Sequence, residues 1–106
     1  PSLPNHPDFD VAQRIMPKGT GMLAFVIKGG DKEAMDFMSR LSIIFEATSL
    51  GGVESLISMP CSTTHVSWKK EDRLAAGIGL GFVRFSTGLE DSEDLIADFE
   101  QALNKI

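Results

Sequence analysis

The sequence is poor in the residues from which disulfide frameworks and metal centres are built. It has one cysteine, Cys61, and two histidines, His6 and His65, among 106 residues. A single cysteine excludes an internal disulfide and a multi-cysteine metal site. The two histidines lie far apart and lack the spacing of metal ligands. We therefore expect no metal site, a structural role for His65, an unreactive thiol at Cys61 and a reducing, cytoplasmic location.

Positive charge and long apolar runs are also scarce. Ten Lys and Arg residues stand against 15 Asp and Glu residues, which gives a formal net charge of −5. Such a balance argues against nucleic acid or an anionic membrane as a partner. No apolar run is long enough to span a bilayer, and the start shows no signal-peptide pattern. The length and the 42% hydrophobic content fit one globular domain.

The chain also lacks an initiating methionine and opens instead with PSLPNHPDFD, which contains three prolines. This opening predicts a piece of a longer protein that begins in a loop. Residues 1–106 are expected to form a single domain. Within it, residues 1–17 are a lead-in segment with a short helix from Asp8 to Met16, which Pro17 ends.

Apolar periodicity predicts alternating helices and strands along the rest of the chain. Strands are expected at 22–28, 53–59 and 82–87, and helices at 32–41, 69–76 and from position 91 to the C-terminus. Asp31, Ser67 and Asp91 are the expected N-cap residues. The order helix, strand, helix, strand, helix, strand, helix indicates an α+β or α/β domain. Local pattern leaves a parallel and a mainly antiparallel sheet open.

The apolar residues of these elements predict which faces are buried. In the helix at 32–41, Ala34, Met38 and Leu41 form the expected stripe, with Met35 and Phe37 on its flanks. The last helix has its own stripe, made of Leu95, Ile96, Phe99, Ala102, Leu103 and Ile106. In the strand at 53–59, alternation places Val53, Ser55, Ile57 and Met59 on one face.

Arg84 interrupts the apolar strand at 82–87. Val83 and Phe85 flank it, so alternation points the guanidinium to the opposite face of the sheet. Arginine is rarely buried without a partner. An arginine in the centre of a short apolar strand therefore indicates an anion on its own face. Both an acidic side chain and a ligand carboxylate fit this pattern.

A second candidate is the loop Ser49-Leu50-Gly51-Gly52, whose small residues allow backbone N–H groups and a hydroxyl to approach a ligand. The other motifs have simpler readings. The glycines at 77–81 precede a strand, so they do not fit a dinucleotide-binding loop, and the acidic run at 90–94 fits a helix N-terminus. The chain contains no self-sufficient catalytic set.

Several segments together resemble one family. SLGGVESLISMP, TTH, DRLAAGI and VRFSTGLEDSEDLIADFEQAL occur in order, after LPNHPDFDVAQRIM and GTGMLAFVIKGG. This series is similar to the C-terminal domain of the trans-sulfuration enzymes, the pyridoxal-phosphate (PLP) enzymes of cysteine and methionine metabolism. The family includes cystathionine γ-synthase, cystathionine lyases, methionine γ-lyase and related sulfhydrylases. The resemblance extends through nearly the whole chain.

The resemblance implies an α+β fold: the small C-terminal domain of an aspartate-aminotransferase-like (fold type I) PLP enzyme. That domain has a mainly antiparallel sheet with helices on one face, and it helps to close the active site. The family holds PLP in an earlier domain, whose Schiff-base lysine and phosphate-binding glycines have no counterpart here. The resemblance thus implies no catalytic or cofactor-binding residue in this chain, which alone is expected to be inactive.

By the same resemblance, Arg84 corresponds to the arginine that binds the substrate carboxylate, and Ser49 contacts the same end of the substrate. Thr48 corresponds to a position that borders the substrate side chain. Some γ-lyases have an acidic residue there, so their specificity does not transfer directly. Thr64 lies near the domain junction, and an indirect supporting role toward the cofactor is expected for it.

The implied activity is β- or γ-elimination or replacement on an amino acid such as cystathionine, methionine or an O-acyl homoserine. Arg84 would bind the α-carboxylate through two parallel hydrogen bonds. The complete enzyme is expected to be a homotetramer. The alternative hypothesis is a free-standing module that senses a small molecule or mediates oligomerisation without catalysis.

Overall fold

The computed structural model describes residues 1–106 and contains one mixed sheet. Its helices are α1 (Phe9–Ile15), α2 (Asp31–Ser39), α3 (Lys70–Ala75) and α4 (Ser92–Leu103). Its strands are β1 (Met22–Val26), β2 (Phe45–Glu46), β3 (Leu56–Ser58) and β4 (Phe82–Ser86). None of the helices has the length and apolar character that crossing a membrane requires.

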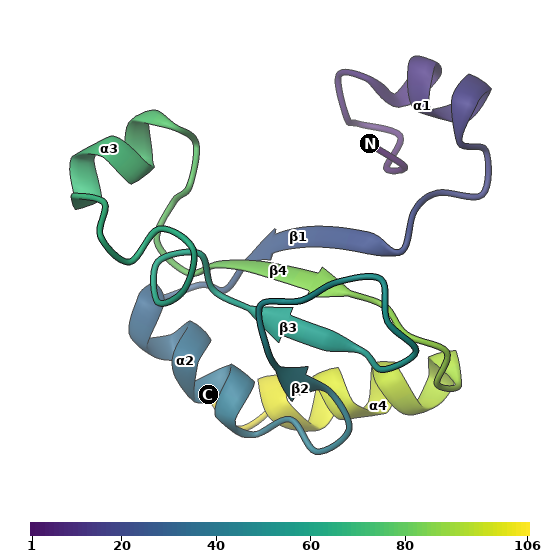
Figure 1. Cartoon of the computed structure of the whole chain (residues 1–106). Coiled ribbons are helices and arrows are strands. Elements are labelled where there is room, and N and C mark those ends of the chain that lie inside the picture. The colour runs from purple at the N-terminus through teal and green to yellow at the C-terminus, as the bar shows by residue number, and fades with distance from the viewer.

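The sheet has the strand order β1-β4-β3-β2, and β4 lies in its middle (Figure 1). Strand β4 pairs antiparallel with both β1 and β3, whereas β2 runs parallel to β3. Helices α2 and α4 lie side by side on one face of the sheet (Figure 1). The expected α+β fold, with a mainly antiparallel sheet and helices on one face, is therefore confirmed.

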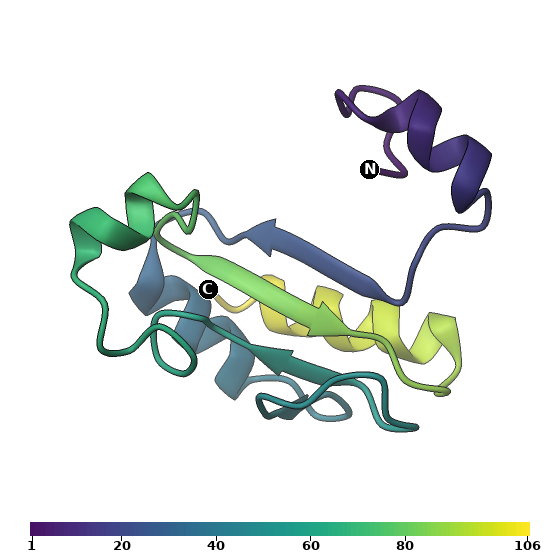
Figure 2. The ribbon, with the colours of Figure 1, turned by 45° about the horizontal axis from the view of Figure 1, so that its top comes forward.

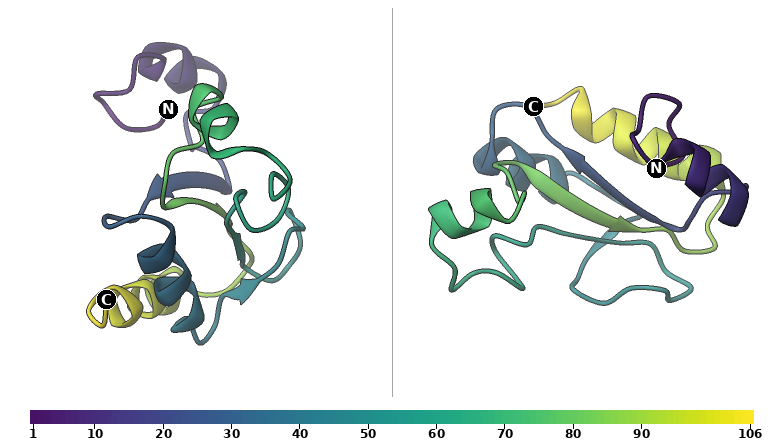
Figure 3. Two further views of the ribbon diagram at one scale, coloured as in Figure 1. Left: turned by 90° about the vertical axis from the view of Figure 1, so that its left-hand side faces the viewer. Right: turned by 90° about the horizontal axis from the view of Figure 1, so that it is seen from above.

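The lead-in segment stands away from this body. Figures 2 and 3 show α1 and the chain before it projecting beyond the end of β1, connected by residues 16–21. Among the apolar residues of this helix and its C-cap, Ala12 is buried, but Ile15 is 70% exposed and Met16 is 37% exposed. The apolar side of α1 is therefore largely uncovered, because few other elements are near enough to cover it.

An aromatic cluster fills the space between the sheet and the two helices. The Phe99 ring lies 5.7 Å from that of Phe37, nearly parallel to it, and 5.0 Å from that of Phe85, edge to face. Phe25 completes the cluster, 5.9 Å from Phe99. Aromatic pairs at these separations add to the stability that burial of their surface provides. The cluster joins β1, β4, α2 and α4 into one core.

Tertiary packing changes some of the predicted faces. Phe37, expected on a flank, is fully buried because α4 packs against that side of α2. Ile96 is 56% exposed and Leu103 is 44% exposed, so α4 buries a narrower stripe than predicted. Val53 is 68% exposed because the chain is an irregular loop until β3 begins at Leu56.

Two of the three expected N-caps are wrong. The N-cap of α2 is Gly30, and Asp31 is the first residue of the helix. Gly30 has a φ of 115°, a backbone conformation that an aspartate would adopt only with strain. The Asp31 carboxylate instead accepts a hydrogen bond from the backbone N–H of Gly81, at 2.7 Å. Ser67 lies before the extended residue Lys69, from which α3 starts without a side-chain cap. The third expectation is confirmed: Asp91 accepts a hydrogen bond from the N–H of Glu93 at 2.8 Å.

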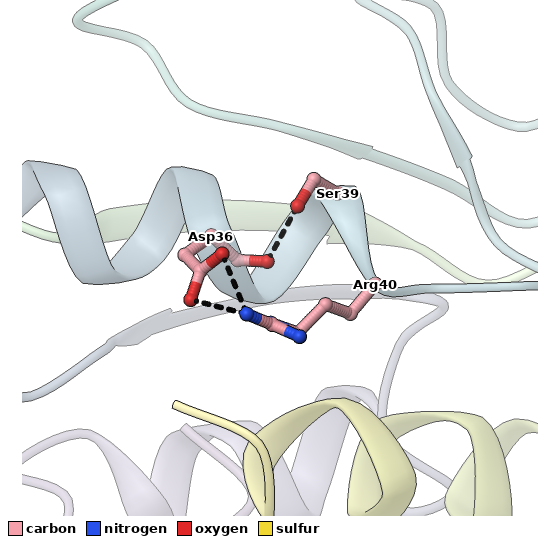
Figure 4. A network of polar contacts seen from close by, with 3 residues as sticks. All are labelled: Asp36, Ser39 and Arg40. Carbon is pink, nitrogen blue, oxygen red and sulfur yellow. Dashed lines mark hydrogen bonds and ion pairs between the residues drawn. The ribbon is translucent and has the colours of Figure 1, made fainter.

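A polar network closes the end of α2, where Figure 4 shows Asp36, Ser39 and Arg40 in contact. One further hydrogen bond joins this end to α4. One nitrogen of Arg40, Nη2, lies 3.0 Å from both carboxylate oxygens of Asp36, and the Ser39 hydroxyl donates to the carbonyl of Asp36. The backbone carbonyl of Arg40 accepts from the Gln101 side chain at 2.6 Å. Because the Arg40 and Asp36 side chains are 36% and 45% exposed, their ion pair adds little stability. These contacts therefore fix the C-terminal end of α2 on the face of the sheet that the helices cover.

Asp98 of α4 is a buried carboxylate that holds the chain after α2. It accepts hydrogen bonds from the backbone N–H groups of Ser42, Ile43 and Ile44 at 2.8–3.2 Å, and it is only 4% exposed. Burial alone would raise its pKa, but these backbone hydrogen bonds and one from Gln101 lower the pKa below its ordinary value. The folded state therefore favours the ionised form.

The replacement Asp98→Asn is expected to lower the free energy of unfolding at pH 7 by about 2 kcal/mol, because the amide accepts these hydrogen bonds poorly. Since the folded-state pKa is depressed, the wild-type carboxylate stabilises the fold above its unfolded pKa, near 4. That contribution is lost as the pH falls through the lower folded value. Urea unfolding between pH 7 and pH 3 should show wild type and variant converging; a constant difference would contradict this linkage.

Candidate functional site

Arg84 lies at the centre of β4, on the sheet face that the helices leave open. Its neighbours in the sheet are Ala24 of β1 and Ser58 of β3, and all three side chains share that face. Val83 is fully buried and Phe85 is 5% exposed on the opposite face, so the predicted alternation is confirmed. The strand thus holds a half-buried cation between two uncharged strand neighbours.

The guanidinium of Arg84 contacts backbone oxygens and makes no ion pair. Its Nη2 donates to the carbonyl oxygens of Thr48 and Ser49, the second at 3.1 Å. No hydrogen bond of the structure engages its Nη1 or Nε. No carboxylate of the chain lies within ion-pair distance of Arg84. The positive charge is therefore uncompensated inside the chain, and donors on two nitrogens remain free.

The loop that supplies these carbonyls is attached to β4 on the same side. The N–H of Gly51 donates to the hydroxyl of Ser86 at 2.9 Å, and the N–H of Leu89 donates to the carbonyl of Val53 at 2.8 Å. Residues 48–54 are all exposed, so hydrogen bonds rather than burial hold the loop. The sequence pattern anticipated N–H groups facing a ligand here, whereas the structure turns two carbonyls toward Arg84.

Glu90 connects the end of the same loop to the turn before α4. Its carboxylate accepts from the N–H of Ser55 at 2.7 Å and from the Ser55 hydroxyl at 2.7 Å. The Ser55 oxygen in turn accepts from the N–H of Gly88 at 2.8 Å. The bonds from the Ser55 backbone and side chain lower the pKa of Glu90. Sequence reasoning assigned Glu90 only to a helix N-terminus, because no local pattern relates residues 35 positions apart.

A groove of about 720 Å³ lies on the other side of Arg84. Arg84 and residues 22–24 of β1 form one wall, and residues 1–3, His6 and residues 18–20 of the lead-in segment form the other. Arg84 therefore lies between this groove and the loop at Thr48 and Ser49.

The structure brings together three of the four predicted site residues. Arg84, Thr48 and Ser49 are in direct contact, but Thr64 is not joined to them. The Thr64 hydroxyl lies 2.8 Å from Nδ1 of His65, whose ring packs edge to face on Trp68 at 4.6 Å. Thr64 and His65 belong to the exposed turn after β3, and Thr64 makes no contact with the Arg84 site.

The lysines bear on whether this chain could hold PLP. A Schiff-base lysine works from a desolvated pocket, yet every lysine of the chain is exposed. Lys18, which is exposed, is the lysine that borders the groove beside Arg84. No group of His, Cys, Asp or Glu side chains has an arrangement that could hold a metal ion. Arg84 gives the groove a cation with free donors, which suits an anion, and His6 and Lys18 are the other titratable side chains that line it.

Comparison with known proteins gives a consistent result. The family model described as Cys/Met metabolism PLP-dependent enzyme matches residues 1–104. An L-methionine gamma-lyase from Pseudomonas deceptionensis is 46% identical over 103 residues, which are 97% of this chain and 26% of that protein. A cystathionine gamma-lyase from Dictyostelium discoideum is 42% identical over 105 residues, 99% of this chain and 27% of that protein.

A solved structure agrees in fold as well as in sequence. The cystathionine gamma-lyase from Lactobacillus plantarum complexed with L-serine superposes with a TM-score of 0.87 at 36% identity. The match covers 99% of this chain and 27% of that chain. The chain thus spans about a quarter of the length of the relatives that it matches.

Proposed function

The chain belongs to the family of Cys/Met metabolism PLP-dependent enzymes, and from this premise we propose that it is the C-terminal domain of a lyase in which Arg84 binds the α-carboxylate of the amino-acid substrate. The observation that supports the proposal most directly is the state of the guanidinium. It is half-buried, has no ion-pair partner, and keeps the donors on Nη1 and Nε free beside a groove. A carboxylate supplies the missing charge and accepts those hydrogen bonds.

The residues around Arg84 have distinct roles in this proposal. The carbonyls of Thr48 and Ser49 hold Nη2, so the plane of the guanidinium is set before substrate arrives. Pre-organised donors bind a carboxylate with less loss of side-chain entropy. Binding at Arg84 then fixes one end of the substrate and so orients the bonds at its Cα. PLP, when bound, supplies the electron sink for chemistry at Cα, Cβ and Cγ.

The cofactor belongs, in this proposal, to a part of the enzyme outside residues 1–106. The exposed lysines of the chain are consistent with that arrangement. Because the relatives with 42–46% identity are gamma-lyases, we propose elimination from cystathionine or methionine rather than transfer onto an O-acyl homoserine. A homotetramer in the cytoplasm is part of the same proposal.

The complete protein that contains this chain, loaded with PLP, is expected to release a 2-oxo acid from cystathionine or from methionine. Residues 1–106 alone are expected to release none, because every lysine of the chain is exposed and none lies in the desolvated pocket from which a Schiff-base lysine works. The measurement is 2-oxo acid formation with each substrate at equal protein concentration. Turnover by the isolated chain would contradict the proposed division of roles.

The coding sequence upstream of Pro1 tests the competing hypothesis of a free-standing module. A long reading frame with a lysine region typical of PLP enzymes supports the proposed enzyme. A start codon immediately before the codon for Pro1 would favour the module.

A further inference from the structure

We infer that Glu90 is a positioning residue for the carboxylate site: through Ser55 it holds the loop at 48–52 against β4, so that the loop's carbonyls orient Arg84. The inference rests on the proposed role of Arg84 and adds a residue that touches neither Arg84 nor a ligand. Glu90 lies in the turn between β4 and α4, whereas the loop precedes β3 (Figure 1).

Both carboxylate oxygens of Glu90 are engaged by one residue, Ser55. Each oxygen of Glu90 accepts one hydrogen bond from Ser55, at 2.7 Å from the backbone nitrogen and 2.7 Å from the hydroxyl. Ser55 is fully buried, and its hydroxyl oxygen also accepts from the N–H of Gly88. Hydrogen bonds to an ionised acceptor are stronger than neutral ones. The end of the loop is therefore tightly held by the turn before α4.

The loop has few other means of staying in place. Residues 48–54 are exposed, and two of them are glycines, which lose the most conformational freedom on ordering. Between Ser55 and the carbonyls at 48 and 49, the side-chain anchor is the hydroxyl of Ser86, which accepts from Gly51. Ser86 is on the same face of β4 as Arg84, two residues further along. Removal of the Glu90 anchor leaves the segment held by the bonds of Gly51 to Ser86 and of Leu89 to Val53, by the backbone bonds of Phe45 and Ala47 to the start of β3, and by Arg84 itself.

The charge of Glu90 suits this role. Its pKa is lowered by the Ser55 backbone and hydroxyl, so Glu90 stays ionised at neutral pH and keeps both acceptors available. No Lys or Arg pairs with it. The two hydrogen bonds from Ser55 therefore stabilise its negative charge, and Arg84 does not. The neighbouring Asp91 caps α4 and does not contact the loop, which makes it a matched control.

The variant Glu90→Ala, made in the complete PLP-loaded enzyme, is expected to speed amide hydrogen exchange at 49–53 about tenfold. It is expected to raise KM for the amino-acid substrate about tenfold while kcat changes less than about threefold. Glu90→Gln should recover most of the lost affinity, because its amide oxygen still accepts from the N–H of Ser55. Asp91→Asn should leave both the loop exchange and KM unchanged.

Ser55→Ala tests the same contact from the other partner, and it can be measured even if Glu90→Ala does not fold. It removes the hydroxyl bond and should increase exchange at 49–53 and raise KM in the same direction. If loop exchange and KM stay at wild-type values in these variants, or if kcat falls only in proportion to the folded fraction, Glu90 has no positioning role. Arg84→Gln separates the two hypotheses: its failure to weaken substrate binding would overturn the carboxylate site itself.

Discussion

Replacing Arg84 with lysine is expected to lower kcat/KM of the complete enzyme for its amino-acid substrate about 100-fold or more, with PLP still bound. A lysine ammonium cannot reproduce the planar set of donors that Arg84 presents. Its single ammonium group could not bind the carbonyls of Thr48 and Ser49 and the incoming carboxylate in the same way at once. The substrate would then bind more weakly and in a less defined orientation.

Steady-state kinetics measure this effect, and the absorbance of bound PLP checks that cofactor content is unchanged. Arg40→Lys is a suitable control, since Arg40 is also a half-buried arginine but is the C-cap of α2, which lies on the other face of the sheet (Figure 1). That control should keep kcat/KM within about twofold, because a surface ion pair contributes little. Near-normal kinetics for the Arg84 variant would remove this residue from carboxylate binding.

The second large effect concerns stability. Phe37→Ala is expected to lower the free energy of unfolding of this domain by about 3–5 kcal/mol, because it empties a fully buried aromatic site. Phe37 stacks on Phe99 at 5.7 Å and meets Phe25 edge to face at 6.3 Å. Those two partners would each lose a packing surface. Helices α2 and α4 would lose much of what holds them together.

Hydrogen exchange of the β4 and α4 amides in the complete protein reports this loss as a free energy of opening. Met35→Ala is the matched control, because Met35 is on the same helix and is 47% exposed. A change of less than about 0.5 kcal/mol is expected there. Equal losses for the two variants would contradict the assignment of Phe37 to the core.

The sequence predicted those features of the site that depend on residues close together in the chain, such as strand alternation and backbone preference. Arg84 between Val83 and Phe85 must face away from the core once the segment is a strand, and it does. The glycine-rich loop and the Asp91 cap follow from backbone preferences in the same way. Phe37 was misplaced because its burial depends on α4, which lies more than fifty residues away in the chain.

The contact between Glu90 and Ser55 is the clearest example of a feature that local sequence pattern could not predict. Its own neighbours indicate a helix start, and only the pairing of β3 with β4 brings Ser55 to it. The same pairing places the carbonyls of Thr48 and Ser49 at the guanidinium. Asp31 likewise caps no helix because Gly81 lies within its reach in the folded chain.

The periodicity and backbone preferences of the sequence determined most of the helices and strands and the face of β4 on which Arg84 lies. Local pattern left a parallel sheet open, so the α+β class followed only from the family that the sequence resembles. The tertiary structure decided which residues are buried and that Arg84 has no acidic partner. It also showed that a loop held by Ser86 and Glu90 contacts Arg84, because hydrogen bonds between distant segments exist only after the strands have paired.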